Sequence, residues 1–336
     1  MLTSMTKTMI KNKKVLNNTI PIILREEAGI LINQDTKVLK PVNNDNDNLL
    51  EKEKNSKLLN NENELTIDSR VIVVTSGKGG VGKTTTTANL GVCLAKKGCS
   101  VALIDADIGL KNLDLLLGLE TRLSYTAMDI IDGSCRLEQA IIRDKQLKNL
   151  ALLAISKNNQ KYNVTQQHMC QLVAALQQLK FDFVLIDCPA GIDVGFIHAI
   201  APANEAIIVT TPELPAIRDA DRVVGLLEAN DIFDIKLLVN RVRIDMIQNN
   251  TMLSVADVCE MLSLSLLGAI PEDQNVIIST NKGKPLALEG NNTISGFAYD
   301  NIANRLLGKE DSYILNESPS NFVINHIKKI TDFFFD

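Results

Sequence analysis

The chain has 336 residues, of which 45% are hydrophobic and 22% charged, and its formal net charge is −5. The acidic balance disfavours a protein that coats nucleic acid through bulk charge, and no apolar run approaches the roughly 18 residues that cross a bilayer. The six cysteines are scattered without a C-x-x-C pair, which disfavours a zinc site, an iron–sulfur site and a disulfide framework.

The first part of the chain differs in composition from the rest. Residues 1–67 are rich in Asn and Lys and poor in aromatic residues. Such a segment buries too little apolar surface to offset the entropy of ordering, so we predict a disordered extension. Its first 25 residues carry five basic groups and no acid. An organelle-targeting peptide is the alternative, but the segment lacks the Ser and Arg enrichment of transit peptides.

From residue 71 onward, short apolar runs alternate with longer helix-like stretches. Runs of Val, Ile and Leu predict strands at residues 71–75, 100–104, 150–155, 183–186, 206–210, 236–239 and 266–270. The segments between them predict helices at residues 84–97, 164–178, 217–229 and 255–262. Near-continuous apolar strands are typical of a parallel sheet that is covered on both faces. The alternation predicts an α/β fold with a doubly wound, mostly parallel sheet flanked by helices, over residues 68–308.

A glycine-rich loop follows the first predicted strand. It fits G-x-x-x-x-G-K-[ST] between a strand and a helix, and predicts nucleotide contacts from Gly77, Lys78, Gly79, Gly80, Val81, Gly82, Lys83, Thr84 and Thr85. Glycines let successive N–H groups face phosphate oxygens, and the helix N-terminus attracts the same anion. We expect Lys83 to reach the β- and γ-phosphates, Thr84 to ligate Mg²⁺ and Thr85 to support the α-phosphate. The motif predicts a P-loop NTPase that uses ATP and Mg²⁺.

Lys78 is a second lysine, at the start of this loop. At that position it is badly placed to fold back onto the phosphates of its own subunit. Either it is simply solvated, as most surface lysines are, or it reaches across a dimer interface. The residues alone leave both readings open.

Two acidic strand ends supply candidate carboxylates. Asp105 and Asp107 follow the second predicted strand, and Asp187 follows the run at residues 183–186. Ligands bind at the carboxyl edge of such sheets. We therefore expect Asp107 to orient the attacking water and Asp105 to join the magnesium shell. Asp187 is expected to hold Mg²⁺ through water, as in a Walker B strand. The alternative is that Asp105 and Asp107 cap the next helical turn.

The loop sequence K-G-G-V-G-K-T-T resembles the deviant Walker A ATPases, the family that contains MinD, ParA and the nitrogenase iron protein. In this family the extra lysine contacts the nucleotide of the partner subunit in an ATP-sandwiched dimer. The resemblance thus implies that the chain forms a homodimer with ATP and that Lys78 is its cross-subunit residue, catalytic together with Lys83 and Asp107.

Other segments are similar to the septum-site-determining branch of the family. They are D-x-D-I-G-L-K-N-L-D, D-C-P-A-G-I, T-T-P-E with R-D-A-D-R, and G-A-I-P-E-D, and the similarity runs from about residue 70 to residue 308. It implies that Asn112 helps to arrange the γ-phosphate and that Asp219 lies at the dimer and partner-binding face. Base contacts are implied at Asn240, Arg241, Pro271 and Asp273. The implied partners are a division inhibitor like MinC and an activator like MinE.

The end of the chain predicts a polar linker at residues 309–321 and an amphipathic helix at residues 322–336. One face of that helix carries Phe322, Val323, Ile327, Ile330, Phe333 and Phe334. A helix of about 21 Å is too short to span a bilayer but can lie among the headgroups. The family resemblance implies a membrane-targeting helix here. The alternative is that the apolar face packs on the chain's own domain.

These observations predict an ATPase that dimerises on ATP, binds a membrane through its C-terminal helix, is released on hydrolysis and places a plastid or cell division site. A ParA-type DNA-segregation ATPase is the alternative, but the acidic balance leads us to expect no nucleic acid. An electron-transfer iron protein is disfavoured, because only Cys188 lies near the required face. Composition favours the chloroplast stroma at the inner envelope over a bacterial cytoplasm and inner membrane face.

Overall fold

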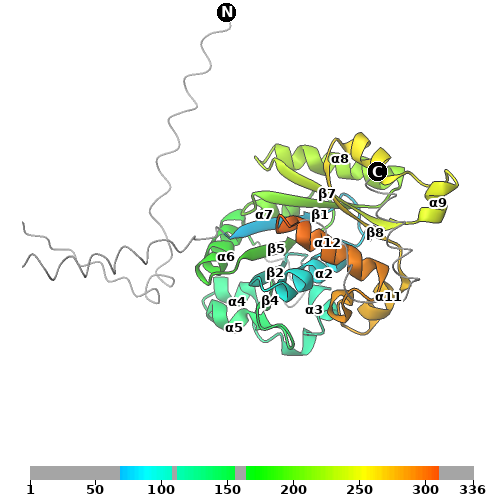
Figure 1. The fold of residues 1–336 in the computed structure, drawn as a ribbon. Helices are drawn as coiled ribbons and strands as arrows, with labels where there is room; N and C mark the ends of the chain where they lie inside the picture. Colours follow the sequence, from blue (N-terminus) through cyan, green and yellow to red (C-terminus); the bar gives the residue numbers. More distant parts are fainter. Residues whose placement is uncertain (1–68, 108–111, 156–163, 310–336) are drawn as a thin grey trace, which may run out of the picture. The chain divides into compact units, whose positions relative to one another are not determined.

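The computed structural model describes residues 69–107, 112–155 and 164–309 (Figure 1). Residues 1–66 and residues 67–336 are separate units, and all described residues lie in the second. The predicted extension at residues 1–67, the tail helix at residues 322–336 and all of the linker except Lys309 lie outside the described part.

An eight-stranded sheet forms the centre of the domain (Figure 1). Its strands are β1 (Arg70–Thr75), β2 (Val101–Asp105), β3 (Ile142–Arg143), β4 (Leu150–Ala154), β5 (Phe183–Asp187), β6 (Glu205–Thr210), β7 (Asp234–Val242) and β8 (Ser265–Pro271). The order is β3-β4-β2-β5-β1-β6-β7-β8, and β3 is the antiparallel member. This confirms the α/β, doubly wound, mostly parallel sheet. Strand β3 was not predicted from the sequence, because two residues are too few to show a pattern.

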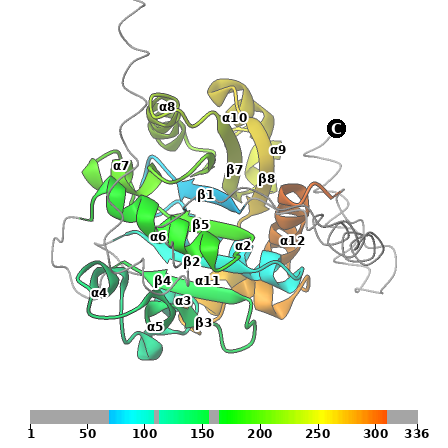
Figure 2. The same ribbon diagram turned by 90° about the vertical axis from the view of Figure 1, so that its left-hand side faces the viewer.

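Helices cover both faces of the sheet (Figure 2). They are α2 (Lys83–Lys96), α3 (Leu113–Leu116), η2 (Glu120–Arg122), α4 (Ala127–Ile131), α5 (Leu137–Ala140), α6 (Gln166–Gln178), α7 (Val194–Ile200), α8 (Leu214–Glu228), α9 (Ile244–Gln248), α10 (Val255–Leu262), α11 (Gln274–Asn281), η3 (Leu286–Glu289) and α12 (Ile294–Leu306). One core packs α6, α7, α8 and α10 against the sheet, and the other packs α2, α3 and α12. In the described ranges, no helix combines the length and the apolarity that crossing a membrane requires.

The two cores explain why the strands are apolar throughout. In β1, Val71 and Val73 belong to one core, whereas Ile72 and Val74 belong to the other. Successive side chains of a strand point to opposite faces, so a strand buried on both faces has no polar alternation. All five of β1's residues after Arg70 are buried.

Helix α12 was missed by the sequence analysis, which placed nothing at Ile294–Leu306. The helix packs against α2 and β8, and its buried residues include Ser295, Asn301 and Asn304. Burial on several sides, with polar residues among the buried ones, removes the apolar stripe from which helices are recognised in a sequence.

The parallel arrangement brings several strand ends to one edge of the sheet. The register pairs Asp105 at the end of β2 with Asp187 at the end of β5, and Val74 of β1 with Asp187. The glycine-rich loop follows β1 directly and leads into α2. The fold therefore positions the loop and both carboxylates at the carboxyl edge, where open α/β sheets bind ligands.

Candidate nucleotide site

Two glycines give the loop a backbone course that other residues rarely adopt. Gly80 has φ 81° and Gly82 has φ 99°, both in the left-handed region that favours glycine. Gly82 is the N-cap of α2, whose first turn is formed by Lys83, Thr84 and Thr85. The unpaired N–H groups of this first turn therefore point towards the loop and can bind an anion.

Gly77 is required for a different reason than the one expected from the motif. A Cβ on Gly77 would lie 2.2 Å from the backbone carbonyl carbon of Asp219 in α8. The start of the loop therefore packs directly on the α8 backbone, and glycine is needed for that close approach. Gly79 has no such neighbour, since the nearest atom to its Cβ position is the Ala190 Cβ at 4.0 Å.

Lys83 and Asp187 form a buried ion pair at the base of the loop. The Lys83 Nζ lies 3.2 Å from Asp187 Oδ1, and the two side chains are 7% and 0% exposed. Thr87 supports the pair, because its hydroxyl donates to the Lys83 carbonyl at 3.1 Å and to Asp187 Oδ1 at 3.4 Å. Burial raises the pKa of Asp187 above its ordinary value, and the nearby Lys83 ammonium opposes that shift. The pair thus fixes the ammonium group beside the loop.

The second oxygen of Asp187 bears on the predicted metal site. Among the described residues, Asp187 Oδ2 is buried and accepts no hydrogen bond. A buried carboxylate oxygen without a partner is costly unless another ligand completes it. Thr84, which lines the adjacent cavity, offers a hydroxyl oxygen of the kind that Mg²⁺ binds. The donor set therefore fits Mg²⁺ held by Thr84 and, through water, by Asp187.

Asp105 binds the backbone on both sides of residues 108–111. Its Oδ1 accepts the N–H of Asp107 at 3.2 Å, and its Oδ2 accepts the N–H of Leu113 at 3.3 Å. Burial and the negative charge of Asp187 raise the pKa of Asp105 to about 7. The side chain does not line the cavity described below. Its expected place in the magnesium shell stays a prediction; in the structure its carboxylate accepts hydrogen bonds from the N–H groups of Asp107 and Leu113.

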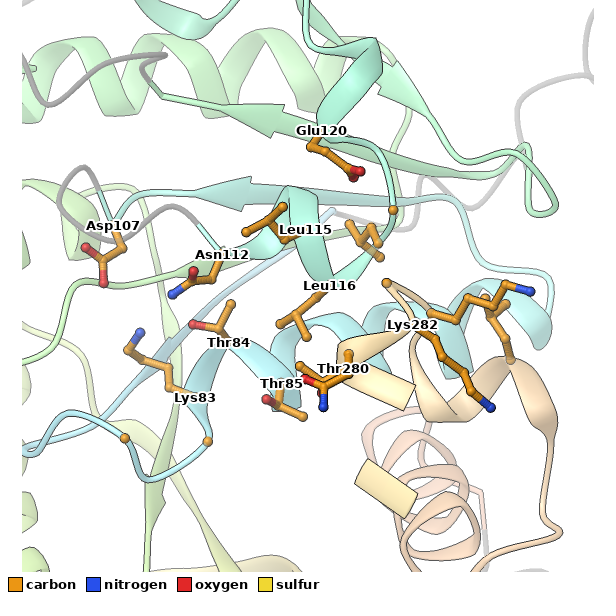
Figure 3. Close-up of a pocket in the computed structure, with 18 of the residues that line it drawn as sticks. Lys83, Thr84, Thr85, Asp107, Asn112, Leu115, Leu116, Glu120, Thr280 and Lys282 are labelled. Carbon is orange, nitrogen blue, oxygen red and sulfur yellow. The ribbon is translucent and has the colours of Figure 1, made fainter. Parts of the chain in front are cut away.

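A cavity of about 890 Å³ opens beside the loop (Figure 3). Its near part contains the expected Lys83, Thr84, Thr85, Asp107 and Asn112, together with Gly79, Gly80 and Gly82. Figure 3 shows Asp107, Asn112 and Thr84 near the end of the Lys83 side chain. The structure therefore brings together the predicted phosphate-binding, water-orienting and γ-phosphate residues in one space.

Lys78 lies outside this cavity. It is absent from the lining residues, its side chain is 47% exposed, and its Nζ lies 3.7 Å from Oε2 of Glu213, which is 55% exposed. An ion pair this exposed contributes at most about 1 kcal/mol. Lys78 is thus held only loosely, and it does not line the cavity beside its own loop.

The predicted base-contact residues divide into two groups. Arg241 lines the cavity, whereas Asn240, Pro271 and Asp273 do not. The Asn240 amide donates to the Val81 carbonyl at 2.7 Å and accepts the N–H of Arg241, so it supports the glycine-rich loop. Asp273 is the N-cap of α11, accepting the Asn275 N–H at 2.9 Å. Base contacts by these residues stay predictions.

Asp219 lies on α8 and is partly exposed. Its carboxylate pairs with Arg222 of the same helix at 3.3 Å. Because its backbone touches Gly77, Asp219 is close to Lys78 in the fold. The structure therefore brings the two residues expected at a subunit interface to the same part of the molecule.

Comparisons with known proteins agree with this site. A ParA family model, described as NUBPL iron-transfer P-loop NTPase, matches residues 68–307. The putative septum site-determining protein MinD of Chlorella vulgaris is 68% identical over 265 residues, which are 79% of this chain and 93% of that protein. The chain belongs to the MinD branch of the ParA family.

Three further proteins support the placement of this MinD-family chain. The chloroplastic minD homolog of Arabidopsis thaliana is 56% identical and aligns with 74% of this chain and 79% of its own. The MinC:MinD complex of Aquifex aeolicus gives a TM-score of 0.67 at 42% identity, covering 74% of this chain and 99% of that one. MinD of Pyrococcus horikoshii complexed with Mg-ADP gives 0.64 at 30% identity, covering 73% and 100%.

Some residues of the site were not foreseen from the sequence. Thr87 stands in a run of four threonines and supports the Lys83–Asp187 pair, and the run itself was the available signal. The far wall of the cavity is formed by Leu115, Leu116, Leu117, Gly118, Glu120, Asp144, Lys145, Gln146, Thr280, Asn281, Lys282, Gly283, Lys284 and Leu288. These residues come from short helices and loops, and no motif in the MinD-family sequence marks them as one surface.

Proposed function

We propose that this chain is an ATPase that dimerises on ATP, binds a membrane through residues 322–336, and is released on hydrolysis to set the position of a division site. The placement of its two loop lysines carries the proposal. Lys83 is fixed inside the cavity by Asp187, whereas Lys78 lies outside it on the exposed face. One lysine is available to the subunit's own nucleotide and the other to the nucleotide of a second subunit.

The residues of the site divide the work of phosphoryl transfer. Lys83 and the N–H groups at the start of α2 bind phosphate oxygens. Thr84 and, through water, Asp187 would hold Mg²⁺, and the ion would offset the negative charge of the transferring group. Asp107 accepts a hydrogen bond from the attacking water and orients it, and Asn112 arranges the γ-phosphate. Lys78 of one subunit neutralises charge on the nucleotide of the other, so hydrolysis depends on dimerisation.

The proposed location and partners rest on the relatives. A chloroplastic relative and green-algal relatives support a plastid, and we propose the stroma at the inner envelope. The MinC:MinD complex supports a division inhibitor like MinC as one partner. An activator like MinE is proposed as the second. The described face near Asp219 is where we place both.

Lipid binding as a function of nucleotide tests this function. Full-length protein and a variant that ends at residue 321 are sedimented with vesicles, in ADP and in a non-hydrolysable ATP analogue. We expect the full chain to bind in the analogue alone, because one short helix binds weakly and two on a dimer gain avidity. Equal binding by the truncated chain would refute the anchor. Retention of DNA in place of lipid would favour the DNA-segregation alternative.

A further inference from the structure

The cavity beside the glycine-rich loop extends beyond the residues that are expected to bind phosphate. In Figure 3, Lys83 lies towards one end, Thr85 and Thr280 follow, and Lys282 lies towards the other end. Thr85 is expected at the α-phosphate, and the nucleoside of ATP is attached to that phosphate. The nucleoside would therefore lie beyond Thr85, beside residues 280–288, which line the cavity with most of their number and which we call the wall segment.

Asn89 joins the wall segment to the phosphate-binding turn. It is 2% exposed, its Nδ2 donates to the carbonyl oxygen of Thr85 at 2.8 Å, and its Oδ1 accepts the N–H of Ala287 at 2.9 Å. Thr85 lies in the first turn of α2, and Ala287 lies in η3, within the wall segment. Asn89 does not line the cavity, so it bridges the two sides without reaching the space for a ligand.

The wall segment has two further contacts with its surroundings. Lys96 Nζ donates to the carbonyl oxygen of Ala287 at 3.0 Å. Gly283 packs on the backbone that follows α3, because a Cβ on Gly118 would lie 2.6 Å from the Gly283 carbonyl oxygen. The segment therefore has a set position relative to α2 and α3, and Asn89 ties that position to the phosphate-binding turn.

From this bridge we propose that the wall segment binds the nucleoside of ATP and that Asn89 is the positioning residue that holds it in register with the phosphate-binding turn. A ligand that contacts two sites gains affinity when the protein already holds both at the spacing that the ligand requires. Asn89 acts through the Thr85 carbonyl and the Ala287 N–H and touches no ligand. The inference rests on the nucleotide binding proposed above and is independent of dimerisation and of lipid.

Two substitutions separate the two ends of the bridge. Asn89→Ala removes both hydrogen bonds. Asn89→Ser keeps a hydroxyl that can donate to the carbonyl four residues earlier in the helix, which is that of Thr85, but it is too short to reach Ala287. It also retains more of the local structure, so it supplies a second measurement if the alanine variant does not fold.

Asn149→Ala is the matched control. The Asn149 Nδ2 donates to the carbonyl oxygens of Ala95 and Cys99, both at 2.7 Å, at the other end of α2. This substitution therefore also removes two hydrogen bonds between an asparagine amide and the backbone, but away from the cavity. We expect the urea midpoints of Asn89→Ala and Asn149→Ala both to fall.

Calorimetric titration of the full-length chain with magnesium and either a non-hydrolysable ATP analogue or tripolyphosphate tests the proposal. We expect both Asn89 variants to bind the ATP analogue about tenfold more weakly than the wild type and tripolyphosphate within about twofold of it. Asn149→Ala should bind both ligands as the wild type does. The loss in the Asn89 variants is thus expected to follow the nucleoside and not the phosphates.

Three results would overturn the proposal. Unchanged affinity for the ATP analogue in the Asn89 variants would mean that the side chain only stabilises the packing of α2. An equal loss for the analogue and tripolyphosphate would assign Asn89 to the phosphates alone, and an equal loss in Asn149→Ala would indicate general loosening of the helix. Failure of the proposed function is a separate result, because it shows in the wild type, as absent binding of the analogue or as absent dimerisation and lipid binding.

Discussion

Lys78 and Lys83 stand in the same glycine-rich loop, but the fold gives them opposite surroundings. Lys83 is almost fully buried, and its ammonium lies 3.2 Å from the buried carboxylate of Asp187. Lys78 is half exposed, and its Nζ lies 3.7 Å from the carboxylate of Glu213, which is itself exposed. The neighbouring glycines also differ, since Gly77 packs on the backbone of α8, whereas a Cβ on Gly79 would make only an ordinary contact with Ala190.

This contrast underlies our proposal that one short motif serves two subunits. The interior lysine has its position set by β5, which delivers Asp187 to the base of the loop. Lys78 has only the exposed contact with Glu213 described above, so a second molecule could bind its ammonium group with little loss of stabilising interactions. In this proposal Lys83 and Lys78 take different roles because one is buried and the other is exposed. Substitutions of the two lysines and of the glycines beside them test that difference.

Replacing Lys83 should have the largest effect. In Lys83→Ala the carboxylate of Asp187 stays buried without its partner, and removing one member of such a pair costs about 3 kcal/mol or more. We expect a lower urea midpoint and loss of ATP hydrolysis. The double variant Lys83→Met with Asp187→Asn removes both charges and should recover most of the stability without the activity. An unchanged urea midpoint in Lys83→Ala would contradict the buried pair.

The two loop glycines form the second test. In Gly77→Ala the new Cβ would meet the Asp219 backbone at 2.2 Å, so the loop must move away from α8. We expect a cost of about 1–3 kcal/mol in the free energy of unfolding and weaker nucleotide binding, measured by denaturation and by titration with a fluorescent ATP analogue. Gly79→Ala is the matched control and should leave stability nearly unchanged. If both variants behave alike, the close approach at Gly77 is not what the loop requires.

Much of the fold was predictable because the strands of a parallel sheet that is covered on both faces are continuous apolar runs in the sequence. All seven predicted strands and all four predicted helices are present in the structure, with their ends shifted by a few residues at most sites. The remaining elements left weaker traces. Strand β3 has only two residues. The buried residues of α12 include the polar Ser295, Asn301 and Asn304, so the helix shows no apolar stripe in the sequence. Apolar periodicity does not reveal an element whose buried residues are determined by its packing partners elsewhere in the chain.

The residues of the candidate site were easiest to predict where they stand together in a motif or at the end of an apolar strand. Lys83, Thr84 and the glycines follow from a contiguous loop, and Asp107 and Asp187 from strand ends. The reason for Gly77 was not visible, because its neighbour Asp219 is far away in the sequence. The Asn240 amide was expected to contact the nucleotide base. It instead donates a hydrogen bond to the Val81 carbonyl, which is possible because β7 ends beside the glycine-rich loop. Such contacts are properties of the folded chain.

Replacing Lys78 should have the smallest effect on the stability of the monomer and a large effect on dimerisation. Removal of an exposed ion pair changes stability by less than about 1 kcal/mol, so Lys78→Ala should unfold as the wild type does and still bind nucleotide. Glu213→Gln breaks the same ion pair, keeps the lysine and serves as the matched control.

Analytical ultracentrifugation with saturating ATP analogue and magnesium measures the central claim most directly. We predict that the wild type and Glu213→Gln sediment as dimers, whereas Lys78→Ala remains a nucleotide-bound monomer. A Lys78→Ala protein that dimerises as well as the wild type, or a wild type that stays monomeric with nucleotide demonstrably bound, would contradict the account.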